Sequence, residues 1–159
     1  MGTANIYHTH VEWTGNLGQG TRTYDGYDRT WNIAVPGREV IECSNDPLLG
    51  GDNKKMNPEE LLLSALSACH MLWFLHLASD MGLSVISYRD IPDGEAELEP
   101  GGKGRFVSVT LRPQIVLGSA PDVLLADAIH ERIGDVCFIA RSVNFPILYA
   151  ARYECRPGE

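Results

Sequence analysis

The chain has 159 residues, of which 44% are hydrophobic and 21% are charged, and its formal net charge is -8. This length and composition are typical of one folded domain spanning residues 1–159, and they exclude an intrinsically disordered chain. The acidic balance argues against nucleic acid and anionic membranes as partners, because no basic stripe is present to neutralise phosphates. The N-terminal segment MGTANIYHTH has neither the positive lead nor the apolar core of a signal peptide, so we expect a cytoplasmic protein.

The first third of the chain has the β-branched and aromatic content of strands. The pattern predicts strands over residues 5–14 and 20–35, joined by a Gly-rich turn, and a third strand over 38–43. Together they predict an antiparallel β-meander. Residues 46–56 are rich in turn formers and charge, and we expect a loop there.

A long helix is predicted over residues 57–81. Asn57 suits the N-cap, Pro58 the first helical position, and Glu60 completes a variant of the capping box. Gly82 supplies a left-handed stop. The helix therefore has clear start and stop signals in the sequence.

This helix is apolar on all sides and long enough to cross a membrane. We favour burial inside a soluble protein, because His70 and His76 lie within the helix and no basic cluster flanks it. A small chain that hides its longest helix completely is expected to share its interior with a second copy.

The remaining elements predict more sheet and one amphipathic helix. We expect a strand over 83–91, a strand end and Gly-rich hairpin over 92–104, and a strand over 105–117, forming a second antiparallel meander. A short helix over 136–143 and a last strand over 147–155 follow. The element order predicts an α+β fold in which helices pack on antiparallel sheet.

The amphipathic helix is predicted to begin at Ser119, which acts as the cap with Asp122 at the third position. Gly134 is expected to end or kink it. One face carries apolar residues at helical spacing, namely Val123, Leu124, Ala126, Ile129 and Ile133.

The four cysteines, Cys43, Cys69, Cys137 and Cys155, form no C-x-x-C pair. A disulfide framework or a zinc ribbon is therefore not expected. Cys69 lies in the apolar helix, where a free cysteine is usually a small core residue. A reactive thiol there would need a nearby cation and partial access.

The five histidines give no metal site. His70 and His76 lie roughly 240° apart around the helix, so they share no face. His8 and His10 share a strand face but lack a third ligand. His130 is expected to be solvated. No metal and no cofactor are therefore expected.

Residues 57–69, NPEELLLSALSAC, resemble the signature of the osmotically inducible protein and organic hydroperoxide resistance (OsmC/Ohr) family, and Cys137 falls where that family has its second thiol. The resemblance implies an OsmC-like α+β fold, with two antiparallel meanders packed around a long central buried helix in an intertwined homodimer. It also implies a cofactor-free thiol peroxidase that reduces organic hydroperoxides.

The resemblance assigns roles to individual residues. Cys69 would be the peroxidatic thiol and Cys137 the resolving thiol, while Glu59 would orient an arginine. Arg29 is the first choice for that arginine and Arg22 the second. A dithiol reductant, of the lipoyl type or another thiol, would reopen the resulting disulfide.

An apolar substrate pocket is expected around Cys69, because its neighbours favour organic or lipid hydroperoxides over hydrogen peroxide. The residues predicted to form it are Leu66, Met71, Leu72, Trp73 and Phe138.

The spacing of Glu59 and Cys69 adds a geometric expectation. Ten residues of straight helix span about 15 Å, too far for both to serve one site in one subunit. Two antiparallel copies crossing near Ser64, where neighbouring residues are small, would bring Glu59 of each beside Cys69 of the other. We therefore predict two composite sites across a dimer interface.

Two alternatives remain. The same dimer could bind a small apolar ligand, with Cys69 merely structural. An acyl-transfer enzyme would need a histidine base near Cys69, and the adjacent His70 points about 100° away on a helix.

Overall fold

The computed structural model describes residues 4–101, 103–118 and 122–155. The chain divides into two compact units, Met1–Leu61 and Leu62–Glu159, which are described separately below. That the two units form one domain stays a prediction.

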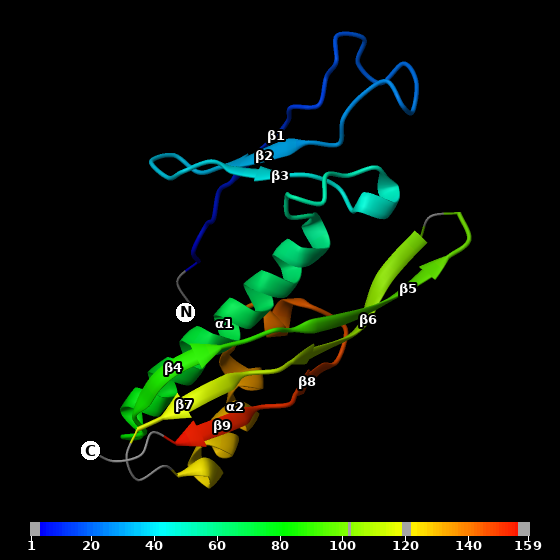
Figure 1. Ribbon diagram of the computed structural model, residues 1–159. Helices are drawn as coiled ribbons and strands as arrows, with labels where there is room; N and C mark the ends of the chain where they lie inside the picture. Colours follow the sequence, from blue (N-terminus) through cyan, green and yellow to red (C-terminus); the bar gives the residue numbers. More distant parts are fainter. Residues whose placement is uncertain (1–3, 102, 119–121, 156–159) are drawn as a thin grey trace. The chain divides into compact units, whose positions relative to one another are not determined.

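The first unit contains the predicted N-terminal meander. Its antiparallel strands are β1 (His10–Trp13), β2 (Trp31–Ala34) and β3 (Ile41–Cys43), in the order β1-β2-β3 (Figure 1). The short 3-10 helix η1 (Pro47–Leu49) lies in the segment predicted to be a loop.

The strands of this meander are shorter than predicted because the segment between β1 and β2 folds on itself. The Asn16 side-chain oxygen accepts hydrogen bonds from the backbone N–H groups of Gly18 and Gly20, at 2.9 and 3.0 Å. A Cβ at Gly15 would lie 1.8 Å from the Asp28 carbonyl oxygen, so only glycine allows the two backbones to approach this closely.

Helix α1 (Pro58–Asp80) confirms the predicted capping signals. The backbone N–H of Glu60 donates to the Asn57 side chain at 2.8 Å, and the Glu60 carboxylate accepts from the Asn57 N–H at 3.0 Å. Gly82 follows the helix with φ 73°, in the left-handed region that suits a glycine stop.

Only one face of α1 is buried within the chain. That face carries Leu66, His70, Phe74, Leu77 and Ala78, spaced at three and four residues. The helix is long and apolar enough to cross a membrane by length and composition alone, and 28% of its most apolar window is buried. The predicted burial is thus right for this face. On the opposite face Ala68 and Leu72 are exposed.

The second unit contains two three-stranded sheets, with orders β4-β7-β9 and β5-β6-β8. Their strands are β4 (Val85–Arg89), β5 (Asp93–Glu99), β6 (Lys103–Leu111), β7 (Gln114–Leu117), β8 (Ile147–Tyr149) and β9 (Arg152–Cys155). The β4/β7 and β5/β6 pairs are antiparallel, whereas β6/β8 and β7/β9 are parallel (Figure 1).

The predicted second meander is therefore wrong in its connectivity. The single strand expected over 105–117 breaks at Pro113, which has no N–H to donate to a ladder, and its two halves join different sheets. The expected strand over 147–155 breaks alongside it. Two backbone hydrogen bonds join the interrupted segments. The Ala150 N–H donates to the Leu111 oxygen at 2.9 Å, and the Arg152 N–H donates to the Pro113 oxygen at 2.8 Å.

Helix α2 (Val123–Val136) is capped by Asp122, whose carboxylate accepts from the Leu125 N–H at 2.9 Å. The predicted cap Ser119 lies outside the described residues. Gly134 does not end the helix, which runs on to a C-cap at Cys137. The 3-10 helix η2 (Ala140–Ser142) stands in the segment predicted as a short helix.

The predicted apolar face of α2 is confirmed for Ala126, Ile129 and Ile133, which have no exposed surface. It is wrong for Leu124, which is 82% exposed. Leu124 is nine residues before Ile133, about 180° around the helix, so it points to the opposite side. His130 takes a place on the buried face instead.

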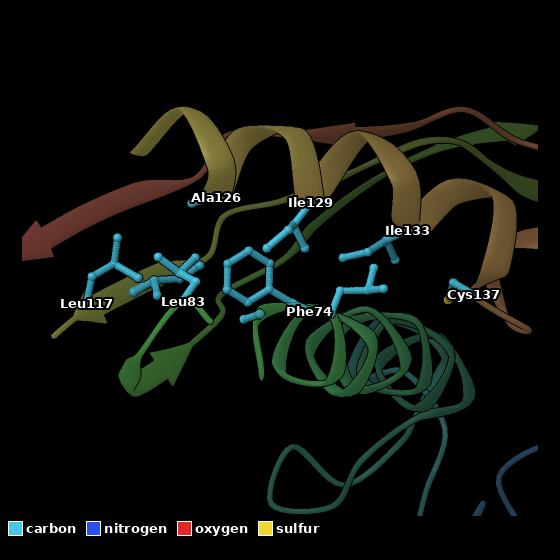
Figure 2. Close-up of a cluster of buried hydrophobic side chains, with 10 residues drawn as sticks. Phe74, Leu83, Leu117, Ala126, Ile129, Ile133 and Cys137 are labelled. Atoms are coloured by element: carbon cyan, nitrogen blue, oxygen red, sulfur yellow. The ribbon is translucent and has the colours of Figure 1, made fainter. Parts of the chain in front are cut away.

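The core of the second unit lies between α1, α2 and the β4-β7-β9 sheet. Figure 2 shows Ala126, Ile129 and Ile133 pointing from α2 toward Phe74 of α1, with Leu117 and Leu83 at one end of the cluster and Cys137 at the other. This packing of helices on sheet confirms the predicted α+β class, and it brings the middle of α1 to the end of α2.

Candidate active site

Two thiols meet where α1 packs against the end of α2. Cys69 lies in the middle of α1, Cys137 is the C-cap of α2, and their sulfur atoms are 2.7 Å apart. Both cysteines are free thiols. Two residues 68 positions apart in the sequence are thus close enough for one sulfur to react with the other.

The two thiols differ in exposure, and the pKa of Cys137 is raised. Cys69 is half-buried, whereas Cys137 has no exposed surface. The pKa of Cys137 is raised to about 11, chiefly by burial and also by the hydrogen bond to Cys69, while the Ala140 N–H, 3.4 Å from the sulfur, opposes the rise. Cys137 therefore keeps its proton at neutral pH and donates its S–H to Cys69.

Arg29 is held in the first unit by two tyrosines. Its guanidinium donates to the backbone oxygens of Tyr27 at 2.8 Å and Tyr24 at 2.6 Å. It also lies over both rings, 4.3 Å from the Tyr24 centroid and 4.5 Å from that of Tyr27. The guanidinium is therefore oriented without help from a carboxylate.

Glu59 is exposed in the first turn of α1. Among the described residues no ion pair joins it to Arg29 within the chain. The second-choice arginine, Arg22, is exposed and makes a local contact of 3.4 Å with Gln19. The role of Glu59 stays a prediction that concerns a second copy of the chain.

A surface groove of about 240 Å³ is lined by Leu72, Trp73 and His76, one to two helical turns along α1 from Cys69. With Cys69 these residues share one face of α1, at positions i, i+3, i+4 and i+7. His76 was not among the residues predicted from the sequence, although this spacing could have identified it. It lies 3.5 Å from Asp80.

The other predicted pocket residues are placed differently. Leu66 is 1% exposed and packs in a second small core with Val109 and Leu111, so it does not line the groove. Met71 is half-buried on α1, and Phe138 is 64% exposed directly after Cys137.

A pair of buried histidines lies beside the thiols and was also missed. His70 Nε2 and His130 Nδ1 are 2.7 Å apart, and the two side chains are 1% and 4% exposed. The prediction that His130 is solvated is therefore wrong, because it lies on the inner face of α2. Burial lowers the pKa of His70 to about 3 and that of His130 to about 4, so both rings are neutral.

The histidine pair also bears on the alternative acyl-transfer mechanism. The Nε2 atom of His70 is engaged by His130, so it is not free to act as a base toward Cys69. Within the described part of the chain, no group of three or more potential ligands could hold a metal ion.

A family model for OsmC-like proteins matches residues 51–149, which include the cap of α1 and both thiols. The chain belongs to the OsmC-like family. An OsmC-like protein of unknown function from Vibrio cholerae is 28% identical, covers 94% of this chain and 100% of its own, and superposes with a TM-score of 0.84. No curated protein sequence matches the chain at a significant level.

Two more distant OsmC-like structures share the fold. An organic hydroperoxide resistance protein from Legionella pneumophila is 16% identical, with a TM-score of 0.66, and covers 95% of this chain and 99% of its own. One from Elizabethkingia anophelis, with thiocyanate bound, is 17% identical, with a TM-score of 0.67, and covers 97% and 100%. At these identities the likeness concerns the OsmC-like fold alone.

Proposed function

We propose that the protein is a thiol peroxidase that reduces organic, lipid-type hydroperoxides. The observation that carries the proposal is the 2.7 Å approach of an accessible thiol, Cys69, to a fully buried one, Cys137. A hydroperoxide can reach only the first sulfur. The second is held, protonated, where it can react with the product of the first step.

In the first step the Cys69 thiolate attacks the terminal oxygen of the hydroperoxide. The O–O bond breaks, the sulfur is oxidised to a sulfenic acid, and the departing alkoxide takes up a proton to leave as the alcohol. The S–H of Cys137 supports this step by donating a hydrogen bond to the reacting sulfur.

In the second step Cys137 attacks the sulfenic sulfur of Cys69. A disulfide forms, and the hydroxyl group of the sulfenic acid leaves as water with the proton of Cys137. A dithiol reductant, lipoyl or other, then exchanges with this disulfide and returns both thiols. We place the cycle in the cytoplasm, where reductants keep free thiols reduced.

A guanidinium is the natural partner for the Cys69 thiolate, and Arg29 remains our choice. Glu59 and Cys69 are ten residues apart on α1, about 15 Å along a straight helix. We therefore propose that the protein acts as a homodimer, in which Glu59 of one copy and Cys69 of the other complete each site. The exposed small residues Ser64, Ala65 and Ala68 on α1 support a close crossing there.

The groove beside Cys69 supports an apolar substrate. Leu72 and Trp73 give it apolar walls within one helical turn of the reacting sulfur. Its occupant could instead be a small apolar ligand, in which case Cys69 would be structural and no peroxide would be consumed.

Mass spectrometry of the protein treated with one equivalent of cumene hydroperoxide tests the proposal. We expect a Cys69–Cys137 disulfide in the natural sequence, a sulfenic acid at Cys69 in Cys137→Ser, and no oxidation of Cys137 in Cys69→Ser. Cys155→Ser removes an exposed thiol away from the site and is the matched control. An unmodified Cys69 after treatment would disprove the peroxidase and favour the ligand-binding alternative.

A further inference from the structure

The His70–His130 pair joins the same two helices as the thiol pair. The His70–His130 bond and the Cys137–Cys69 bond are side-chain hydrogen bonds that link α1 to α2 and its C-cap. A third contact, from Arg132 of α2 to the sulfur of Met81 at 3.5 Å, lies just beyond the end of α1. His70 is the neighbour of Cys69 on α1. His130 precedes Cys137 by seven residues, about 20° short of two full turns, so both face α1 from one side of α2.

The two imidazoles are held tightly in place. Their planes lie within 7° of each other, the His70 ring rests on Tyr149 at 4.6 Å between centroids, and the His130 ring rests on Phe74 at 4.5 Å. A hydrogen bond enclosed by stacked rings has little freedom to lengthen or turn. It therefore fixes both the rotation of α2 and its position along α1.

The histidine pair lowers the stability of the fold in one respect, because it leaves a buried polar atom without a partner in the described part of the chain. The Nε2 atom of His130 is buried and has no hydrogen-bond partner among the described atoms. Two leucines would fill the same space and leave no buried nitrogen without a partner. Contacts between apolar side chains are not directional, however, and they allow several relative positions of the two helices. A single N–H···N bond allows only one.

We propose that His70 and His130 are positioning residues whose hydrogen bond fixes α2 against α1 and so holds Cys137 within reach of Cys69. The proposal rests on the function proposed above, which it deepens. Once Cys69 is a sulfenic acid, the fixed register keeps Cys137 close enough to form the disulfide with loss of water before further oxidation occurs. The histidines act through the thiols and take no part in the chemistry.

The test is the thiol–disulfide equilibrium of the pair with glutathione, which needs no hydroperoxide. One oxidised glutathione accepts two electrons from Cys69 and Cys137, giving the protein disulfide and two reduced glutathiones. The disulfide fraction, read by intact mass after acid quench and alkylation, gives the effective concentration of one thiol toward the other. All variants carry Cys155→Ser, so that the exposed thiol forms no mixed disulfide.

Two substitutions of His130 separate positioning from simple packing. His130→Phe keeps an aromatic ring on Phe74 but loses the bond, whereas His130→Asn loses ring volume but keeps a polar nitrogen near the place of Nδ1. Positioning predicts that His130→Phe lowers the effective concentration about tenfold or more, equivalent to about 30 mV, and that His130→Asn stays within about threefold of the parent. A packing role predicts the reverse order and would overturn the proposal. The exposed His10→Phe is the control.

Two further measurements guard against a variant that does not fold. His70→Leu/His130→Leu leaves no orphan nitrogen, and the same tenfold fall is expected in it, while an unchanged value overturns the proposal. Ring ¹⁵N NMR of the unmutated reduced protein should show complementary neutral tautomers sharing one hydrogen between about pH 6 and pH 8. Two independently solvated rings would contradict the bond itself.

The two proposals fail in different ways. If the parent forms the disulfide with glutathione and His130→Phe forms it about tenfold less readily, but the parent consumes no hydroperoxide, the peroxidase is wrong and the positioning role stands. If it consumes hydroperoxide but His130→Phe forms the disulfide as readily, the positioning role is wrong and the peroxidase stands.

Discussion

The sulfur of Cys137 lies 2.7 Å from that of Cys69, yet Cys137 has no exposed surface and Cys69 does. A reagent from solvent therefore meets Cys69 before Cys137. The raised pKa of Cys137 acts in the same direction, because a protonated thiol is a poor nucleophile.

Alkylation should report this order directly. At pH 8 we expect iodoacetamide to modify Cys155 and Cys69, and Cys137 at least about a hundredfold more slowly, because Cys137 is both buried and protonated. Peptide mapping over time gives the three rates. The rate at Cys137 should rise as the pH approaches 11 or when urea unfolds the protein. Equal rates at Cys137 and Cys155 at pH 8 would show that Cys137 is neither shielded nor protonated as described.

The free energy of unfolding should fall in mild acid. Folding lowers the pKa of His70 to about 3 and that of His130 to about 4, from an ordinary value of 6.5. Below about pH 6 the unfolded chain therefore binds two protons that the folded chain does not, so stability falls by up to about 3 kcal/mol per pH unit. Well above pH 6.5 both states are neutral and the pair adds no pH dependence.

Urea unfolding at pH 7.5, 6.0 and 5.0 measures this slope, in buffers at about 0.1 M ionic strength so that surface charges are screened. His70→Leu/His130→Leu should be nearly flat over the same range, because its core contains no titratable group to protonate. A parent as flat as this double variant would mean that the histidines are not buried in solution.

Substrate preference should depend on the groove. We expect cumene hydroperoxide to oxidise Cys69 faster than hydrogen peroxide does, because Leu72 and Trp73 offer an apolar wall beside the sulfur. Leu72→Ser should reduce that preference about tenfold by removing apolar contact area, with little change in the rate with hydrogen peroxide. Stopped-flow tryptophan fluorescence in the Cys137→Ser background isolates this step. Equal rates for the two peroxides in the parent would refute an apolar site.

Mixed dimers should reveal whether the sites are composite. Cys69→Ser and Glu59→Ala chains are each expected to be inactive alone. After unfolding and refolding together they should regain activity, because a mixed dimer contains one site with both Cys69 and Glu59 and one with neither. One of the two sites in each mixed dimer would then work. Random pairing makes about half of the dimers mixed, so about a quarter of all sites should be active. Activity that stays absent, while native mass spectrometry shows mixed dimers, would place Glu59 and Cys69 in the same chain's site.

The boundaries of α1 could be predicted because their signals are local. Asn57, Glu60 and Gly82 specify the ends of α1 through contacts within one turn, and these contacts form as expected. The pairing of the two thiols was predicted from a family resemblance, because the sequence spacing of Cys69 and Cys137 does not by itself indicate that they lie close together. The contacts of Arg29 could not be predicted, because its partners Tyr24 and Tyr27 are loop residues without a periodic pattern.

The predictions that proved wrong concern residues whose structure depends on partners far away in the sequence. Residues 105–117 alternate as one strand, and only Pro113 hints that the two halves join different sheets. His130 has the polarity of a surface residue, and its burial depends on finding His70 on another helix. A polar residue at a core position of an amphipathic helix was the available signal, because His130 falls beside Ala126, Ile129 and Ile133 on one face.

The parallel pairing of β6 with β8 and of β7 with β9 has a consequence for folding kinetics. Each pair closes a loop that contains the whole of α2 and η2, whereas the antiparallel β5/β6 pair is joined directly by a short connection. Closing such a long loop costs chain entropy before the strand pairing contributes any stabilising free energy. We therefore expect these two parallel ladders to form late in folding. Tyr149, which covers His70, belongs to β8. The thiol pair would thus acquire its final surroundings only in the closing stage of folding, after the helices have met.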